Sequence, residues 1–201
     1  MGGVLASFLD RPSVEVAPSL LGCVLWHGEV AVRLTEVEAY EGFSDPASHA
    51  YRGQTPRNAV MFGPPGYAYV YFTYGMHFCV NLVCMPVGVP SAVLLRAGEI
   101  VAGVPVARSR RGPAVSDRDL ARGPARLCQA LGIDRSQNGA SVLDPASPLR
   151  LESPAAPVAA PVRSGPRVGI REAADIPWRF WLDGDPTVSP YRPWVPKPRR
   201  V

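Results

Sequence analysis

One aromatic run limits how this chain can fold. The run, residues 67–75, has the sequence YAYVYFTYG and holds four of the seven tyrosines. If residues 67–72 form a strand, the first three of these tyrosines share one face, because strand side chains alternate. The fourth, Tyr74, has the other parity and precedes a glycine, so we expect it to project from a turn. Such a face suits stacking on flat rings such as nucleic-acid bases, although aromatic residues also favour strands that pack into a core.

Hydrophobic periodicity elsewhere predicts further strands and two helical segments. A helix or helical turns are expected over residues 7–22, with Gly22 as the stop, and a short helix over Pro124–Leu131. The expected strands are Cys23–Trp26 and Val30–Tyr40, joined as a hairpin, then Phe78–Cys84, Ala92–Ala97, Arg167–Ile170 and Arg179–Leu182.

Glycine and proline mark the segments between these elements. Residues 41–66 read as a long loop, 103–116 as a loose surface segment, 144–166 as a stretch of little pattern, and 190–201 as a Pro/Arg-rich tail. The chain has no internal repeat and no clear linker. We therefore expect one α+β domain over residues 1–201, with a curved antiparallel sheet as its core, surrounded by helices and long loops.

The positive charge is unevenly distributed along the chain. The net charge is +4, but residues 1–106 sum to −3 and residues 107–201 to +7. A basic half suits a polyanionic partner, although an arginine-rich composition would give the same count. No apolar run approaches the roughly 20 residues that cross a bilayer, and the N-terminus lacks the basic start of a signal peptide. We expect a cytoplasmic, nucleoid-associated protein with no membrane partner.

Metal and nucleotide-binding motifs are missing from the sequence. The four cysteines form no CxxC pair, and with three scattered histidines they give no zinc signature. Neither a GxGxxG motif, a P-loop nor a GxSxG motif is present. We expect reduced, buried thiols and no metal or cofactor.

Two carboxylates share a strand face with a tyrosine. Glu36, Glu38 and Tyr40 have one parity in the expected strand over residues 30–40. One interpretation is a hydrated face, as in many antiparallel sheets. The functional alternative is that one carboxylate activates a nucleophile while a flat substrate lies on Tyr40.

Three other polar residues stand out by their surroundings. His49 follows a turn-forming Ser-Asp-Pro segment, Asn81 interrupts an apolar strand, and Arg96 ends another. Buried amides and guanidinium groups need partners. Each residue is therefore either a structural contact or a ligand contact.

Long motifs in chain order resemble those of the 3-methyladenine (alkyladenine) DNA glycosylase family. The resemblance covers roughly residues 15–190, and it departs from longer family members in the short stretch between residues 49 and 54 and in the Arg/Pro-rich stretches 103–116 and 145–166. The matching motifs are Val37-Glu38-Ala39-Tyr40, His49, Gln54-Thr-Pro-Arg-Asn58, Met61-Phe62, Tyr69-Val-Tyr71-x-x-Tyr74-Gly-Met76, Asn81, Leu94-Leu-Arg-Ala97, Gly123-Pro-x-x-Leu-Cys-Gln-Ala-Leu131, Arg167-Val-Gly169 and Pro177-Trp-Arg-Phe180.

The resemblance implies a monofunctional base-excision repair enzyme. Such an enzyme flips an alkylated or deaminated purine out of double-stranded DNA and hydrolyses its N-glycosidic bond with an activated water. We expect it to act as a monomer. The only lysine, Lys197, lies in the tail, and a water nucleophile explains why no other lysine is needed.

The resemblance also implies a role for each matching residue. Glu38 is the general base and Arg96 helps it to hold the water. The base pocket consists of Tyr40, Ala47, His49, Tyr71 and Asn81; the two tyrosines form a sandwich around the base, and Asn81 crowds the exocyclic amine of guanine. Tyr74 is the wedge that fills the gap in the duplex, and the DNA-binding residues are Thr55, Arg57, Tyr69, Tyr74, Gly75, Met76 and Arg126.

Two other functional classes share some of these features. A sugar hydrolase would also use paired carboxylates and aromatic platforms, but Glu36 and Glu38 lie on one strand and cannot easily flank a bond. A non-catalytic module that binds single strands would use the tyrosines and arginines without needing Glu38. Loss of base release with retained binding in a Glu38→Gln variant separates the glycosylase from both classes.

Overall fold

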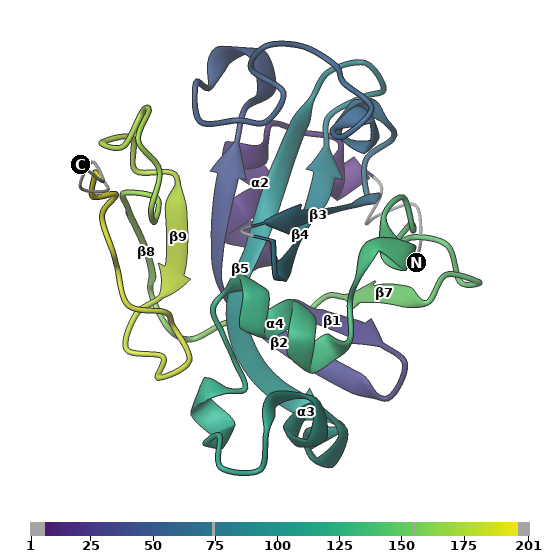
Figure 1. Cartoon of the computed structure of the whole chain (residues 1–201), viewed down its shortest axis with the longest axis vertical. Coiled ribbons are helices and arrows are strands. Elements are labelled where there is room, and N and C mark those ends of the chain that lie inside the picture. Colours follow the sequence, from purple (N-terminus) through teal and green to yellow (C-terminus); the bar gives the residue numbers. More distant parts are fainter. Residues whose placement is uncertain (1–6, 74, 155, 197–201) are drawn as a thin grey trace.

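The structure is a computed structural model that describes residues 7–73, 75–154 and 156–196. An antiparallel sheet runs through it, with helices and long loops around the sheet (Figure 1), which confirms the α+β class and the antiparallel core. The helices are α2 (Ser13–Leu20), α3 (Val104–Arg111) and α4 (Pro124–Leu131). The strands are β1 (Val24–His27), β2 (Val30–Tyr40), β3 (Ala68–Thr73), β4 (His77–Cys84), β5 (Ser91–Ala102), β6 (Ala121–Arg122), β7 (Leu149–Glu152), β8 (Val162–Gly165) and β9 (Arg179–Leu182).

Strand β2 is the centre of the sheet. The main strand order is β3-β4-β5-β2-β1-β7, and β6 pairs with β5. Along one edge β2 pairs with β5 over nearly its whole length. Along the other edge its first half pairs with β1 and its residues 36–38 pair with β9, which in turn pairs with β8. Segments from the start, middle and end of the chain therefore meet at the second half of β2.

The two faces of the sheet have different compositions. Alternation places apolar side chains of β2, β4 and β5 in the main hydrophobic core, where α2 and α4 add further residues. The other face carries tyrosines, carboxylates and an arginine beside a smaller apolar cluster around Met61. Main-core residues of these five elements include Val37, Ala39, Val80, Leu82, Val93, Leu95, Val16, Leu20, Leu127 and Leu131.

The long loop expected over residues 41–66 is confirmed. It contains two short 3-10 helices, Gly42–Ser44 and Ala59–Phe62, and no strand. Gly42 has a φ of +52°, and a β-carbon there would overlap the carbonyl oxygen of Pro90. This close approach fixes the start of the loop against the connection that leads into β5.

The expectation of a loose segment over residues 103–116 is wrong, because α3 occupies Val104–Arg111. Gly103, with a φ of +68°, turns the chain out of β5, and a proline stands in the first turn of the helix, where its missing N–H costs nothing. Ala107 is buried against the core, and arginines fill the last turn, where the helix dipole favours positive charge. The high arginine and proline content concealed these signals.

The expected strand over Arg167–Ile170 is also wrong. The strand that pairs with β9 is β8, Val162–Gly165, which lies five residues earlier. Pro166 follows it and has no N–H to continue the ladder, and Gly169 has a φ of +69° that belongs to a turn. The segment 144–166, which showed little pattern, thus contributes both β7 and β8.

The other expected elements are confirmed with small changes of boundary. The β1–β2 hairpin, β4, α4 and β9 lie where the sequence placed them, and the segment 7–22 contains α2. Strand β5 runs to Ala102 rather than ending at Ala97, because Gly98 interrupts the apolar pattern while the pairing with β2 continues past it through a register shift between Leu34 and Glu36. Residues 190–196 of the expected tail form no helix or strand, but the carbonyl of Arg192 accepts a hydrogen bond from Gly169 N at 3.0 Å.

The four cysteines are free thiols in the buried part of the protein. Burial raises the pKa of Cys23 to about 11 and raises the pKa of Cys79, Cys84 and Cys128 as well. Within the described ranges, no helix is long and apolar enough to cross a membrane.

The close approach at Gly42 gives a test of the fold by substitution. We expect Gly42→Ala to lower the free energy of unfolding by about 2–5 kcal/mol. About 1–2 kcal/mol of this loss comes from the left-handed φ, and the remainder comes from overpacking against Pro90. Urea unfolding of the variant and of the wild type measures the difference.

Gly28→Ala is the matched control. Gly28 has a similar φ of +57°, but no atom lies within 4 Å of the position of a β-carbon. We expect it to show only the conformational cost of about 1–2 kcal/mol. Equal losses in the two variants would mean that the contact with Pro90 does not constrain the loop.

Candidate active site

A row of side chains crosses four neighbouring strands on the polar face of the sheet. Tyr69 of β3 is paired with Asn81 of β4, Asn81 with Leu94 of β5, and Leu94 with Glu38 of β2. Paired residues point to the same face of a sheet, and neighbouring strands are about 4.8 Å apart. The pairing therefore brings Glu38 to within about 10 Å of Asn81, although 43 positions separate them in the chain.

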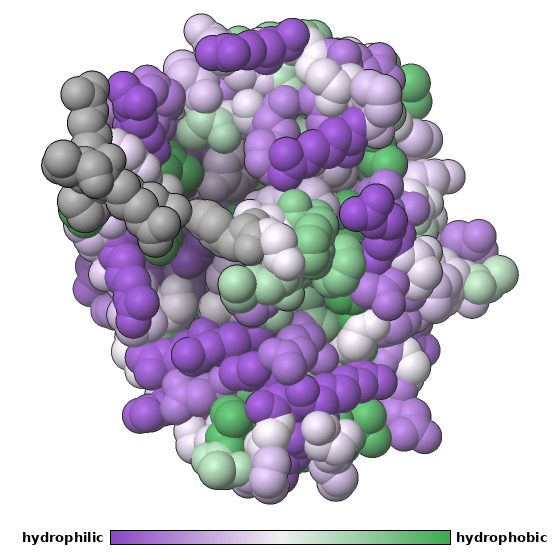
Figure 2. Space-filling model, viewed as in Figure 1, coloured by the Kyte–Doolittle hydropathy of each residue, from purple (hydrophilic) through white to green (hydrophobic). Residues whose placement is uncertain are grey.

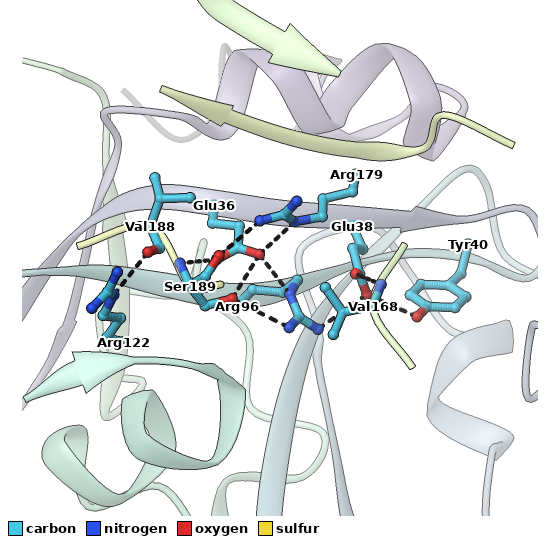
Figure 3. Close-up of polar contacts among 9 residues, drawn as sticks. All are labelled: Glu36, Glu38, Tyr40, Arg96, Arg122, Val168, Arg179, Val188 and Ser189. Atoms are coloured by element: carbon cyan, nitrogen blue, oxygen red, sulfur yellow. Dashed lines mark hydrogen bonds and ion pairs between the residues drawn. The ribbon is translucent and has the colours of Figure 1, made fainter. Parts of the chain in front are cut away.

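The common face of Glu36, Glu38 and Tyr40 is confirmed, but the hydrated alternative is wrong. Both carboxylates are 0% exposed. The segments around residues 168 and 189 lie over this face and supply backbone donors to it (Figure 3). A buried carboxylate is tolerated because such donors and the neighbouring guanidinium groups compensate its charge.

Glu36 is the centre of a buried ionic cluster. Its Oε1 accepts hydrogen bonds from Arg96 Nε at 2.9 Å, Arg179 Nε at 2.7 Å and Ser189 Oγ at 2.9 Å, and its Oε2 accepts one from Ser189 N at 2.7 Å (Figure 3). Burial acts to raise the pKa of Glu36, but the charges of Arg96 and Arg179 hold it below its ordinary value. Glu36 is therefore an anion that binds strands and segments together.

Glu38 is held by three donors. Its Oε2 accepts hydrogen bonds from Tyr40 Oη at 2.9 Å and Arg96 Nη1 at 3.3 Å, and its Oε1 accepts one from Val168 N at 2.7 Å. Burial acts to lower the pKa of Arg96, but Glu38 and Glu36 raise it above its ordinary value, so the guanidinium stays charged. Unlike Glu36, Glu38 lines a cavity.

The cavity has a volume of about 270 Å³ and brings the expected catalytic and pocket residues together. The expected catalytic and pocket residues in its wall are Glu38, Arg96, Tyr40, Ala47, His49, Tyr71 and Asn81. Tyr69, which was expected to bind DNA, also lines it. The others are Met61, Thr73, Cys79, Leu94, Pro124, Val168, Gly169 and Ile170, none of which was singled out from the sequence as a site residue.

Aromatic rings form one wall of the cavity. Tyr71 packs edge-on against the imidazole of His49, with ring centroids 4.6 Å apart, and at 5.5 Å from the ring of Tyr69. The His49 Nδ1 lies 3.0 Å from Tyr69 Oη. Tyr69 is 1% exposed, so the structure places this expected DNA-binding residue in the cavity wall rather than on the outer surface.

The rings of this wall are uncharged at neutral pH. Burial and the nearby Arg57 lower the pKa of His49, so its imidazole is neutral. Burial raises the pKa of Tyr69 to about 12, and burial with the neighbouring Cys79 raises that of Tyr71 well above its ordinary value. An aromatic cavity with a carboxylate at its edge can stack a flat ring and act on a bond at the rim of that ring.

Asn81 has a fixed orientation. Its Nδ2 donates a hydrogen bond to the carbonyl oxygen of Tyr69 at 3.0 Å, and the side chain is buried. Because the amide is anchored in the wall, a group that enters the cavity cannot push it aside without breaking this bond.

A second buried ion pair, which sequence analysis missed, supports the cavity from behind. Arg167 donates to both carboxylate oxygens of Asp45, at 2.5 and 2.8 Å, and to the carbonyl oxygen of Ala39 at 3.0 Å. Its guanidinium lies 4.6 Å from the ring centroid of Tyr40 and 5.2 Å from that of Trp178. Arg167 does not line the cavity, so it covers a face of Tyr40 that a substrate would not use.

Long-range pairing hid this ion pair and the Glu36 cluster from sequence analysis. Asp45 and Arg167 are 122 positions apart, and Glu36 and Ser189 are 153 positions apart. A Ser-Asp-Pro turn and a single arginine give no local sign that they meet. The only available signal was that Glu36 has the same strand parity as Glu38.

Five expected DNA-binding residues lie outside the cavity wall. Thr55 and Arg57 are exposed in the long loop, and Arg57 lies over the ring of Tyr71 with its Cζ 5.9 Å from the ring centroid. Met76, 68% exposed, lies in the β3–β4 turn, and Arg126 is exposed on α4.

Gly75 is also exposed in the β3–β4 turn, beside Met76. Tyr74, the expected wedge, lies outside the described residues. Among the residues that the structure describes, no group of three or more His, Cys, Asp or Glu side chains is placed to hold a metal ion.

The chain matches a known family over most of its length. Residues 7–186 match the family model described as methylpurine-DNA glycosylase (MPG). Three similar bacterial proteins carry the name "Putative 3-methyladenine DNA glycosylase".

These relatives cover nearly the whole chain. The protein from Streptomyces avermitilis is 56% identical, and the alignment covers 96% of this chain and 94% of that protein. The one from Frankia casuarinae is 54% identical over 96% and 93% of the two chains, and the one from Cutibacterium acnes is 54% identical over 90% and 96%. The chain therefore belongs to the methylpurine-DNA glycosylase family, whose members are hydrolases of N-glycosyl bonds.

Proposed function

We propose that this protein flips an alkylated or deaminated purine of the 3-methyladenine class out of duplex DNA and hydrolyses its N-glycosidic bond with water. The observation that carries the proposal is the position of Glu38, a carboxylate held by three donors at the edge of an aromatic cavity. The names of the relatives supply the lesion class.

Glu38 acts as the general base in this mechanism. A water beside it gives a proton to the carboxylate while its oxygen bonds to the sugar C1′. The bond between C1′ and the base nitrogen breaks, and its electron pair leaves with the base. A purine methylated at N3 or N7 already carries a positive charge and leaves as a neutral base, whereas a neutral lesion such as a deaminated purine leaves as an anion that takes a proton from solvent. Arg96, which already contacts Glu38 at 3.3 Å, helps to hold the water.

The cavity walls hold the flipped base. Tyr40 and Tyr71 stack on its two faces, which suits a ring that has lost its neighbours in the duplex. His49 and Ala47 contact the edge of the base. Asn81, held in place by the carbonyl of Tyr69, excludes purines that carry an amine at that edge.

The β3–β4 turn opens the duplex. Tyr74 is the proposed wedge, and the neighbouring Gly75 and Met76 are exposed beside it. An inserted side chain offsets part of the cost of unstacking, a few kcal/mol per step. Thr55, Arg57 and Arg126 contact the DNA around the opening.

All the proposed catalytic and pocket residues come from one chain. We propose that the protein acts as a monomer. A substrate in chromosomal DNA would place the enzyme at the nucleoid.

We expect Glu38→Gln to lower the single-turnover rate of base release by about 10² to 10⁴-fold, the usual range for loss of a general base. Affinity for lesion-containing duplex should stay within about tenfold, because the amide keeps the shape of the side chain. Gel-based release assays with enzyme in excess and fluorescence anisotropy measure the two quantities.

Glu99→Gln is the matched control, because it removes a carboxylate from an exposed pair with Arg33 on the same sheet. Its rate should match that of the wild type. A near-normal rate in Glu38→Gln would reject the assignment and direct attention to Glu36, whereas a wild type that binds lesions without releasing them would indicate a binding module.

We expect Asn81→Ser and Asn81→Ala to relax selectivity toward undamaged guanine. Removing the fixed amide leaves room for an exocyclic amine that the wild type excludes, which is discrimination by steric exclusion. The measurement is the ratio of release rates for guanine and ethenoadenine in otherwise identical duplexes. An unchanged ratio in both variants would contradict the proposed role of Asn81.

We expect release of the base with the abasic strand left intact and without a metal ion. Strand cleavage by β-elimination needs an amine that forms a Schiff base with the sugar, and the sequence has only Lys197 and the α-amine. Incubation with lesion duplex and borohydride should trap no covalent complex, and chelator should not lower the rate. A trapped complex, or activity that chelator removes and metal restores, would overturn a mechanism based on water and Glu38.

A further inference from the structure

Three arginines lie close together on the surface formed by α3 and α4. Arg110 and Arg111 belong to the last turn of α3, and Arg126 is exposed in the first turn of α4. Figure 2 shows this part of the molecule as a broad hydrophilic band below an apolar patch that lies over the β3–β4 hairpin. We call these three residues the arginine cluster.

Arg110 is held in a fixed position at the end of α4. Its Nη1 donates to the carbonyl oxygen of Ala130 at 2.9 Å, and its guanidinium covers Gly132, where a β-carbon would lie only 2.9 Å from Arg110 Cζ. The contact with Ala130 also caps α4, a common structural role for arginine. This role uses Nη1 alone, and Nε and Nη2 have no hydrogen-bond partner among the described residues.

Arg111 is fixed in a similar way. Its Nε donates to the carbonyl oxygen of Leu120 at 2.8 Å and its Nη1 to Gln129 Oε1 at 2.6 Å. Partial burial and the positive charge of Arg126 lower the pKa of Arg111, while the charge of Asp119 acts to raise it.

The arginine cluster differs from its neighbours in its ion pairs, although Asp119 is near enough to Arg111 to act on its charge. Arg108 pairs with Asp117, while Arg118 and Arg122 pair with Asp119. Among the described residues, no member of the cluster forms a salt bridge. Neutral carbonyl and amide groups orient Arg110 and Arg111, so their charge remains available to a partner.

A groove runs between the β3–β4 turn and Arg110, which is the one member of the cluster in its lining. It has a volume of about 530 Å³, and the turn and β4 contribute Met76, His77 and Phe78 to its walls. One face of α4 also lines it, through Ala125, Cys128, Gln129 and Gly132. Asp134, the one acidic residue in the lining, is bonded to Ser136.

We propose that the groove and the arginine cluster bind consecutive phosphates of one DNA strand beside the flipped nucleotide. This proposal rests on the proposed function, because the β3–β4 turn is the part that would enter the duplex. A strand that leaves the turn would pass Met76 and then follow α4 toward Arg110. Guanidinium groups match phosphate with two parallel hydrogen bonds, and groups that are already oriented lose little side-chain entropy when they bind.

The position of the cluster distinguishes this strand from the contact expected at Arg57. Arg57 lies in the long loop over Tyr71, on the side of the hairpin that faces the cavity. The groove lies along α4 and is lined by the hairpin at its turn, and the cluster adjoins the groove through Arg110. The two groups of arginines would therefore hold the backbone on different sides of the inserted turn.

Salt dependence of binding to an undamaged duplex tests the cluster without using the active site. Each phosphate contact contributes about 0.9 to the slope of log affinity against log salt concentration. We expect Arg110→Gln, Arg111→Gln and Arg126→Gln each to reduce that slope by about 0.9. Arg150→Gln is the matched control, because it removes the same charge from β7, at the opposite edge of the sheet from β3, and should leave the slope unchanged.

A second measurement locates the contacted phosphates. A lesion duplex with a 2′-fluoro sugar, which resists hydrolysis, is prepared with one neutral methylphosphonate at each position around the lesion in turn. The wild type should lose affinity several-fold at two or three adjacent positions on one strand. Arg110→Gln should lose no further affinity at one of these positions, because its partner charge is already gone.

These outcomes decide the proposal even if one variant folds poorly. Arg126 has no hydrogen bond or salt bridge to another described residue, so Arg126→Gln tests the cluster with no loss of an internal contact, and Arg110→Lys restores the charge if Arg110→Gln is unstable. The proposal that the cluster binds consecutive phosphates would be overturned by either of two results. One is a wild-type salt slope in both Arg111→Gln and Arg126→Gln. The other is a loss of affinity in Arg110→Gln that adds to the methylphosphonate loss at every position. Base release by the wild type on the cleavable duplex reports separately on the proposed function.

Discussion

The buried carboxylate of Glu36 is the interaction on which the arrangement of the site depends. It joins β2 to Arg96 of β5, to Arg179 of β9 and to Ser189 near the end of the described chain. An unpaired buried charge costs several kcal/mol, so these donors must assemble together or not at all. Glu36 thereby helps to fix the position of Arg96, so the contact between Arg96 and Glu38 depends on a residue that does not line the cavity.

The second buried ion pair, between Asp45 and Arg167, also holds distant segments together. Arg167 connects the long loop, the end of β2 and the segment that donates Val168 N to Glu38. Three walls of the cavity thus depend on one guanidinium. Removing either of the two buried clusters would loosen the cavity without touching any group that is proposed to contact the base.

Strand parity explains what the sequence could predict. The shared faces of Glu36, Glu38 and Tyr40, and of Tyr69 and Tyr71, follow from alternation within a single strand. The long motifs shared with the glycosylase family identified the residues that the cavity brings together. Their individual roles remain predictions, since a cavity shows proximity and not chemistry.

Register and long-range pairing explain what the sequence could not predict. No local pattern shows that Tyr69, Asn81, Leu94 and Glu38 form one row, or that Asp45 meets Arg167. Helix α3 was missed because its signals, a glycine, an early proline and one buried alanine, resemble those of a loop in an arginine-rich stretch. The strand beside β9 was misplaced because Val168 and Ile170 continue the apolar alternation beyond Pro166.

The buried thiols acquire a meaning if the proposed function is correct. Reagents that methylate purines also attack cysteine, and they do so through the thiolate. All four cysteines are buried, and their raised pKa values keep them protonated, including Cys79 in the cavity wall. Such an enzyme can stay active in the presence of the alkylating agents that create its substrates, because its buried and protonated thiols react poorly with them.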